Sequence, residues 1–212
     1  DIVKKGDEAK VDFFFVGGSL IRKNNVDRCI DEIKKHSNIP VILFPGSSMQ
    51  ISEKADGILF LSLISGRNAD MIIGRQVITA PILKNTDIEI LSTGYMLIDS
   101  GNMTTASYIS NTRPIPYDKN DIAVCTAMAG EMLGMKMIYM DAGSGGKNPI
   151  STDMVNMVAK DIDIPLIVGG GISSPEKAEL NCKAGADIIV VGNAIEKDIN
   201  LIKEISNAIH NI

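Results

Sequence analysis

The chain has 212 residues, of which 45% are hydrophobic and 22% are charged, and its formal net charge is −5. This length and apolar content suffice for a substantial core, so we expect a single α/β domain over residues 1–212. The mild acidity, without a basic stripe, argues against a nucleic-acid surface, although backbone amides can still bind an anion. No apolar run approaches the roughly 18 residues of a membrane-spanning helix, so we predict no membrane span.

Cysteine usage predicts a reducing environment. Cys29, Cys125 and Cys182 are far apart and odd in number, and they fit neither a disulfide framework nor a C-x-x-C metal site. Residues 1–10 are too highly charged for a signal peptide. We therefore expect a cytoplasmic location.

Seven mainly apolar stretches have the length of buried strands. The run that precedes Gly169, for example, follows Pro165, and its three consecutive apolar residues suit a strand that is covered on both faces. In chain order, the expected strands occupy residues 11–16, 39–44, 58–61, 94–98, 137–140, 164–168 and 187–191.

Helical segments separate these strands. Between residues 26 and 35, apolar side chains stand at Val26, Cys29, Ile30 and Ile33, which is the spacing of one helix face. In chain order, the expected helices occupy residues 1–10, 26–35, 68–83, 118–133, 151–160, 176–183 and 199–209, and residues 104–116 are expected to form an irregular connection.

Strands that alternate with helices indicate a parallel sheet, and function is expected at the edge where the strands end. Seven strands are one fewer than a (β/α)8 TIM barrel contains, and the sequence starts on a helix, so the strand missing from it would be the first. We therefore predict an α/β fold of the (β/α)8 TIM-barrel type that lacks its first strand. A doubly wound open sheet is the alternative, and the phosphate loops described next favour the barrel.

Two glycine-containing loops follow the last two expected strands. Gly169-Gly170-Gly171 precedes Ser174-Pro175, which mark a helix start by a capping serine and a proline at the first helical position. A loop of bare backbone before a helix N-terminus presents N–H groups and the positive end of a helix dipole to an anion. Gly192-Asn193 ends the last strand, so both loops stand where barrels commonly bind phosphate. Glycines that only turn the chain are the alternative.

The segment Tyr139-Met140-Asp141-Ala142-Gly143-Ser144-Gly145 combines a phenol, a carboxylate and a hydroxyl with small residues. Alternation along the strand directs Tyr139 and Asp141 to the same face, so both could reach one polyol. A carboxylate at this place could accept a proton from a hydroxyl group. For Asp141, the alternative is a residue that caps a helix or braces a loop.

Gly17-Gly18-Ser19 ends the first expected strand. Its hydroxyl and carbonyl groups could help to hold a divalent cation or a diphosphate, and a plain turn is the alternative. His36 and His210 fall at polar helix ends, where we expect them to be solvated.

The motifs along nearly the whole chain are, in order, Val16-Gly17-Gly18-Ser19, Leu43-Phe44-Pro45-Gly46, Phe60-Leu61-Ser62-Leu63, Gly94-Tyr95, Tyr139 to Gly145, Val168-Gly169-Gly170-Gly171-Ile172 and Val191-Gly192-Asn193. Together they resemble the geranylgeranylglyceryl phosphate synthase family. The resemblance implies a (β/α)8 barrel that joins a prenyl diphosphate, expected to be geranylgeranyl diphosphate, to the free hydroxyl of sn-glycerol 1-phosphate. An ether forms and diphosphate leaves with Mg²⁺ assistance, in the first ether step of archaeal-type membrane lipids.

The resemblance also assigns site residues by position. Asp141 would be the catalytic base, Ser19 would contribute to the Mg²⁺ site, and Tyr95 would line an apolar groove for the prenyl chain. The residues that would bind sn-glycerol 1-phosphate are Tyr139, Asp141, Ala142, Gly143, Ser144, Gly145, Gly170, Gly171, Gly192 and Asn193. The sequence departs from the family in two respects. Family members usually have glutamate at the position of Asp141, and their first-strand segment with a metal-binding aspartate has no counterpart before Asp1.

Two other functions remain open. One is a phosphate-binding barrel enzyme of another type, such as a sugar-phosphate isomerase or a flavin enzyme, although the segment from Tyr139 to Gly145 favours a small polyol. The other is a non-catalytic scaffold that retains phosphate binding. The resemblance further implies a homo-oligomer, either a dimer or a hexamer, and a prenyl length that is set by the depth of the apolar groove.

Overall fold

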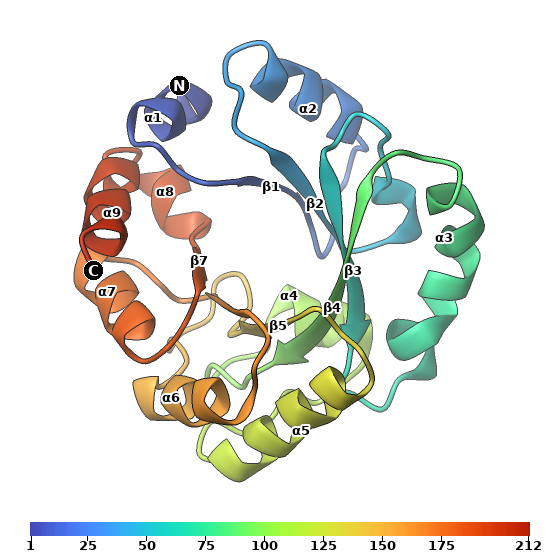
Figure 1. Ribbon diagram of the computed structural model, residues 1–212, viewed down its shortest axis with the longest axis vertical. Helices are drawn as coiled ribbons and strands as arrows, with labels where there is room; N and C mark the ends of the chain where they lie inside the picture. The colour runs from blue at the N-terminus through green and yellow to red at the C-terminus, as the bar shows by residue number, and fades with distance from the viewer.

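The computed structural model describes residues 1–212. Its seven strands form one parallel sheet in sequence order, and the sheet curls into a ring that the helices surround (Figure 1). The strands are β1 (Phe14–Gly18), β2 (Val41–Pro45), β3 (Gly57–Leu63), β4 (Glu89–Leu97), β5 (Met137–Asp141), β6 (Leu166–Gly169) and β7 (Ile188–Val190). A doubly wound sheet reverses its strand order at a switch point. The unbroken order found here excludes that alternative, and the predicted barrel-type α/β fold with seven strands is confirmed.

Helices follow the strands on the outside of the ring. They are α1 (Ile2–Glu8), α2 (Val26–Lys34), the 3-10 turn η1 (Ser48–Gln50), the π-helix η2 (Asp70–Gly74), α3 (Arg75–Leu83), α4 (Thr105–Ser110), α5 (Asn120–Met132), α6 (Thr152–Asp161), α7 (Pro175–Lys183), α8 (Asn193–Lys197) and α9 (Leu201–His210). The predicted cap of α7 is confirmed, because Oγ of Ser174 accepts a hydrogen bond from the N–H of Lys177 and Pro175 is the first helical residue. None of the helices is both long and apolar enough to cross a membrane.

The strands β1 and β7 are the two edges of the sheet, and no backbone pairing joins them. Helices α1 and α9 lie beside these edges (Figure 1). They contact each other, and Oγ of Ser206 on α9 donates a hydrogen bond to the carbonyl oxygen of Ala9 at 2.7 Å. The helical layer is therefore continuous between the chain ends although the sheet is not.

Alternation along the strands separates two apolar layers. Met96 of β4 and Met140 of β5 point outward and pack with buried residues of α5 and α6. Tyr95 and Tyr139, their neighbours in the chain, point into the ring. The other fully buried members of this inner cluster are Ile42, Leu59, Leu63, Leu97 and Ile167. Because both faces of each strand are covered, the strands read as nearly continuous apolar runs.

The expectation of an irregular connection over residues 104–116 is wrong for α4. Oγ1 of Thr104 accepts a hydrogen bond from the N–H of Ser107, whose hydroxyl lies 3.1 Å from the N–H of Thr104, and Asn111 ends the helix with a φ of 50°. This arrangement is a capping box, but serine replaces the glutamate or glutamine that usually marks one in a sequence. The signal was therefore weak.

Strand β1 spans Phe14–Gly18 instead of residues 11–16. Three further differences from expectation concern other elements. Strand β4 begins at Glu89 instead of residue 94, because Glu89 and Ile90 pair with Gly57 and Ile58 of β3 although both are exposed. The expected helix over residues 68–83 divides into the π-helix η2 and α3. A short helix, α8, precedes the expected last helix. Of these three, the last two follow the ends of β3 and β7, whereas the first lies where β4 begins.

Candidate active site

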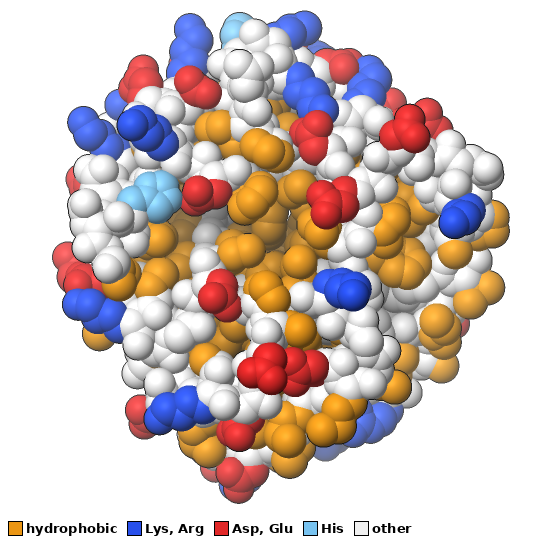
Figure 2. All heavy atoms as spheres, in the orientation of Figure 1, with side chains coloured by type: hydrophobic (Ala, Val, Ile, Leu, Met, Phe, Trp, Pro, Cys, Tyr) orange, Lys and Arg blue, Asp and Glu red, His pale blue; other side chains and the backbone are white.

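A cavity of about 1450 Å³ occupies the centre of the ring and the loops that follow the strands. Figure 2 shows hydrophobic side chains gathered around a hollow at the centre of the face in view. Apolar residues of the inner cluster line the cavity, among them Phe44, Leu61 and Tyr95. Polar groups are contributed by two groups of loops, one after β5, β6 and β7 and the other after β1 and β2. The cavity thus combines an apolar interior with two polar rims.

The carboxylate of Asp141 is the central polar group of the cavity. The hydroxyl of Tyr95 donates a hydrogen bond to its Oδ2 atom at 2.5 Å, and the N–H of Gly143 donates to its Oδ1 atom at 2.7 Å. Burial raises the pKa of Asp141 above its ordinary value, while these two hydrogen bonds oppose the rise. A carboxyl group in this state is suited to accept a proton near neutral pH, because its basicity exceeds that of a solvated aspartate.

Two phenols stand beside this carboxylate. Tyr139 is almost fully buried, stacks on Phe44 with ring centroids 5.0 Å apart, and meets Tyr95 edge to face at 5.4 Å. Burial, with the negative charge of Asp141 as a second cause, raises the pKa of both tyrosines well above the ordinary value. Both phenols therefore stay protonated at neutral pH, and that of Tyr95 donates to Asp141. Tyr139 and Asp141 both line the cavity from one face of β5, as their alternation in the sequence predicts. The hydrogen bond from Tyr95 to Asp141 could not be predicted from the sequence.

The loop after β6 packs directly on the loop after β5. Gly170 has a φ of 82°, and a Cβ atom there would lie 2.7 Å from Oδ1 of Asp141 and from the N–H nitrogen of Ala142. Gly171 also has a positive φ, of 71°. Turn geometry and close packing thus account for these glycines, as the alternative interpretation held. Both residues nevertheless line the cavity, with their backbone exposed to a ligand.

The loop after β7 completes this rim. The hydroxyl of Ser144 donates a hydrogen bond to Oδ1 of Asn193 at 2.8 Å, which joins the loops after β5 and β7. Gly192 has a negative φ, and a Cβ atom there would meet no atom within 4 Å. Packing does not require glycine at this position, and the open space in front of it is available to a ligand. Lys177 adds a cation to the same rim.

Nearly all the predicted glycerol phosphate residues line this one cavity. They are Tyr139, Asp141, Gly143, Ser144, Gly145, Gly170, Gly171, Gly192 and Asn193. Ala142 differs, because its methyl group is buried in the outer core and its N–H donates to the carbonyl oxygen of Gly169. It supports the loop from behind.

The second rim is formed by the loops after β1 and β2. A Cβ atom on Gly46 would lie 2.7 Å from the Cα atom of Ser19, so the two loops touch. Between them lies the buried amide of Gln50, which donates to the carbonyl oxygen of Gly18 at 2.9 Å and accepts from the N–H of Gly46 at 3.2 Å. Ser19 also lines the cavity. Nothing in the sequence pattern marked Gln50 as the residue that fixes this rim.

The surroundings of Ser19 do not by themselves fit a magnesium site. Magnesium in proteins usually binds one or two carboxylates in addition to water and substrate phosphates. The cavity residues of the loops after β1 and β2 offer hydroxyl and carbonyl oxygens but no carboxylate. Nor does the chain contain a group of three or more His, Cys, Asp or Glu side chains that could hold a metal ion. The assignment of Ser19 as a metal ligand stays a prediction.

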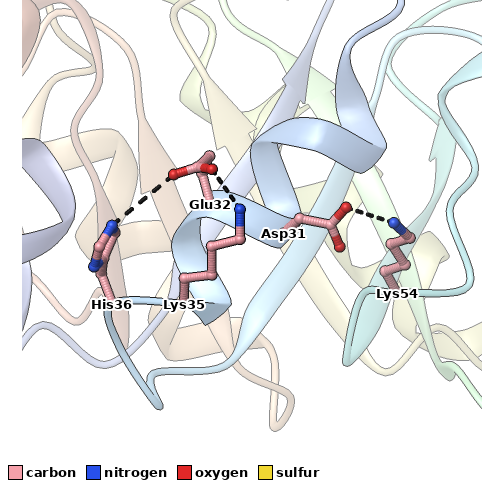
Figure 3. Close-up of polar contacts among 5 residues, drawn as sticks. All are labelled: Asp31, Glu32, Lys35, His36 and Lys54. Atoms are coloured by element: carbon pink, nitrogen blue, oxygen red, sulfur yellow. Dashed lines mark hydrogen bonds and ion pairs between the residues drawn. The ribbon is translucent and has the colours of Figure 1, made fainter.

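Both histidines lie at helix ends, and His210 is also among the residues that line the cavity. His36 is exposed after α2, where Glu32 lies 3.9 Å from its Nε2 atom in a surface group with Lys35 (Figure 3). Nε2 of His210 lies 3.1 Å from Oδ2 of Asp12. Exposed pairs of this kind contribute little stability, and the structure gives neither histidine a contact with Asp141.

Comparisons with known proteins show the family of the chain. Residues 1–209 match the PcrB family. Over 210 residues the chain is 59% identical to a protein of Chitinophaga pinensis named geranylgeranylglyceryl phosphate synthase, covering 99% of this chain and 83% of that protein.

Two solved structures share the fold over the whole chain. The crystal structure of (S)-3-O-geranylgeranylglyceryl phosphate synthase from Thermoplasma acidophilum, in complex with sn-glycerol-1-phosphate, is 35% identical with a TM-score of 0.94, and 86% of it is covered. The wild-type enzyme from Thermoplasma volcanium is 38% identical with a TM-score of 0.92 and the same coverage. A family match over nearly the full length and a relative of this identity are decisive, and the chain belongs to the PcrB family.

Proposed function

We propose that the protein is a prenyltransferase that joins geranylgeranyl diphosphate to sn-glycerol 1-phosphate. The observation that carries the proposal is the buried Asp141 carboxylate, which Tyr95 and Gly143 hold at the junction of an apolar cavity and a glycine-rich rim. Relatives named geranylgeranylglyceryl phosphate synthase, and the related structure with sn-glycerol-1-phosphate, support this choice of substrates.

The rim after β5, β6 and β7 would bind the acceptor. The backbone of Gly170 and Gly171 and the open space at Gly192 suit a phosphate group, with Asn193 at its side. The N-terminus of α7 adds a partial positive charge there. With its phosphate on this rim, glycerol would extend toward Tyr139 and Asp141. Both lie deeper in the same cavity.

The reaction then requires a proton transfer and a displacement. The glycerol hydroxyl gives its proton to Asp141 as its oxygen forms a bond to C1 of the prenyl chain, and the bond from C1 to the diphosphate oxygen breaks with its electron pair on the leaving group. Holding the two substrates at the correct distance is a large part of the catalysis. The apolar residues Phe44, Leu61 and Tyr95 suit the prenyl chain and exclude water.

Magnesium dependence belongs to the proposal, on the strength of the resemblance in sequence. A bound Mg²⁺ ion would supply Lewis-acid neutralisation of diphosphate charge, and Ser19 would stand among its neighbours. Activity measured with and without added Mg²⁺ tests this expectation.

Location and assembly are also proposals. Three free cysteines fit a reducing cytoplasm. A homo-oligomer is supported by exposed apolar side chains on the outer face of η2 and α3, where hydrophobic surface is visible beside the ring (Figure 2). These side chains are Ile73, Val77, Ile78 and Ile82.

Product analysis tests the central proposal. The protein is incubated with geranylgeranyl diphosphate, Mg²⁺ and sn-glycerol 1-phosphate, and the lipid fraction is analysed by mass spectrometry. We expect geranylgeranylglyceryl phosphate and an equal amount of diphosphate, with far less product from sn-glycerol 3-phosphate. Binding of glycerol phosphate without an ether product would instead favour the scaffold, and turnover of a phosphosugar would favour another barrel enzyme.

A further inference from the structure

Arg75 places a cation on the rim formed by the loops after β1 and β2. It is the first residue of α3, and its Nη1 atom donates a hydrogen bond to the carbonyl oxygen of Gly46 at 2.7 Å. Gly46 itself packs on Ser19, as described above. The half-buried Arg75 side chain lines the cavity together with both loops. It thus reaches the rim from a third segment of the chain.

The charge of Arg75 has no acidic partner within the chain, because none of the ion pairs includes it. Arg75 is the only charged residue among the cavity-lining residues from Phe14 to Ser110. A guanidinium group has five N–H donors, and the bond to Gly46 uses one of them. A partly buried and unpaired charge is unfavourable unless an anion binds to it. The site therefore offers several donors and a full positive charge to a ligand.

The backbone and neighbours of Arg75 are firmly held. The side-chain amide of Gln76 donates hydrogen bonds to the carbonyl oxygens of Leu61 and Met71, which ties the start of α3 to β3 and to the π-helix η2. On the facing side, Gln50 fixes Gly46. Because its neighbours are held in this way, the Arg75 side chain loses little conformational entropy when an anion binds, which favours affinity for that anion.

We propose that Arg75 binds the diphosphate group of the prenyl donor and stabilises it as the leaving group. The inference rests on the proposed prenyl transfer. Guanidinium and phosphate oxygens form paired, charge-assisted hydrogen bonds, and Ser19 and Ser47 line the cavity nearby with further hydroxyl groups. As the bond from C1 to oxygen breaks, negative charge grows on the diphosphate, so the interaction with Arg75 strengthens in the transition state.

Binding of inorganic pyrophosphate tests the assignment without requiring turnover. Calorimetry is carried out on the native protein, on Arg75→Met and on Arg67→Met. Arg67 is a matched control, because it also donates to a backbone carbonyl, that of Gly66 at 2.8 Å, but does not line the cavity. We expect Arg75→Met to weaken pyrophosphate binding by about 10-fold or more, with no change for Arg67→Met. The affinity for sn-glycerol 1-phosphate should change less than about 2-fold in either variant.

Kinetics and a second variant separate binding from structural support. Arg75→Met should raise KM for the prenyl diphosphate and lower kcat, while KM for sn-glycerol 1-phosphate stays the same. Arg75→Lys keeps the positive charge but not the forked set of donors, so its losses in pyrophosphate affinity and kcat should be smaller than those of Arg75→Met. If Arg75→Met does not fold, Arg75→Lys takes its place in both measurements. Equal pyrophosphate affinity in all the proteins, or equal losses for both ligands, would overturn the assignment. The two proposals can fail separately. If pyrophosphate binding depends on Arg75 but the protein forms no ether product, the anion site is upheld and only the proposed prenyl transfer is contradicted.

Discussion

The hydroxyl of Tyr95 donates a hydrogen bond to Oδ2 of Asp141 at 2.5 Å, from one strand of the barrel to the next. Strands β4 and β5 run in parallel with Tyr95 opposite Tyr139 and Leu97 opposite Asp141. This register sets the two tyrosines level with each other and places Asp141 two residues further along β5, within reach of the Tyr95 hydroxyl. The resemblance in sequence implies a longer glutamate at this position in the family, so the firm hold on Asp141 matters for a side chain with a shorter reach.

Replacing Tyr95 by phenylalanine removes the donor and keeps the ring. The bond from Tyr95 lowers the pKa of Asp141, so without it that pKa rises and the acidic limb of the activity profile moves to higher pH. We expect kcat to fall by about 10-fold or more and stability to fall by about 1–3 kcal/mol, because a buried carboxylate oxygen loses its partner. Measuring kcat/KM against pH checks the shift, with Tyr117→Phe at an exposed tyrosine as the control. An unchanged profile would show that Tyr95 does not set the basicity of Asp141.

Replacing Asp141 by asparagine should separate activity from stability. Turnover should fall by about 100-fold or more, because a general base contributes at least that factor, while phosphate affinity changes little. Burial raises the folded-state pKa of Asp141, so this carboxyl stabilises the fold at pH values below its unfolded pKa and loses that contribution as pH rises through the folded pKa. The asparagine variant cannot ionise. The melting temperature of the variant minus that of the native protein should therefore increase as pH rises from the unfolded pKa of Asp141 through its folded pKa. A difference that stays constant over this pH range would contradict a raised pKa for Asp141.

Alanine at the two glycine loops should give different results. Gly170→Ala places a methyl group 2.7 Å from Asp141 at a positive φ, so we expect a loss of at least about 2 kcal/mol in stability. Gly192→Ala meets no neighbouring atom. Its backbone angles, a φ of −120° and a ψ of −86°, lie outside the usual regions for alanine, so we expect a stability loss of about 1 kcal/mol, smaller than that for Gly170→Ala. The methyl group of Gly192→Ala nevertheless enters the space assigned to the phosphate, so affinity for sn-glycerol 1-phosphate should fall. Denaturant titration and calorimetry measure the two quantities, and unimpaired binding by Gly192→Ala would remove this loop from the phosphate site.

Gln50→Leu should loosen the rim assigned to the donor. The substitution keeps the size of the side chain but removes the hydrogen bonds to Gly18 and Gly46. Leaving two buried backbone groups unpaired should cost about 1–3 kcal/mol for each group that water does not reach. KM for the prenyl diphosphate should rise more than KM for sn-glycerol 1-phosphate. Equal changes in the two KM values would mean that Gln50 supports the fold in general and not this rim.

Glutamate on the outer face of α3 should disrupt the proposed homo-oligomer. Val77 and Ile78 are each more than half exposed, and a charge placed between two apolar surfaces is costly when they associate. The double variant Val77→Glu, Ile78→Glu should have a lower mass by light scattering than the native protein. Leu180→Glu, on the exposed face of α7, is the control. A native protein that is monomeric, or an unchanged mass in the double variant, would argue against this interface.

The sequence by itself determined the repeating architecture. Apolar runs, glycine at strand ends and the Ser174-Pro175 cap depend on local chemistry, and they located seven strands and the start of α7. Alternation within one strand likewise placed Tyr139 and Asp141 on one face. Where the local signal was unusual, as in the serine capping box of α4, the prediction was wrong because the pattern lacked its common residue.

Only the tertiary structure decided which distant side chains meet. Tyr95 is 46 residues from Asp141, and Gln50 is 32 residues from Gly18. Arg75 reaches Gly46 across 29 residues. Such contacts depend on strand register and on the curvature of the sheet, because these set which atoms from separate strands converge. No pattern within a single segment contains that information, so the partners of Asp141 and the cation on the second rim emerge only when the ring is assembled.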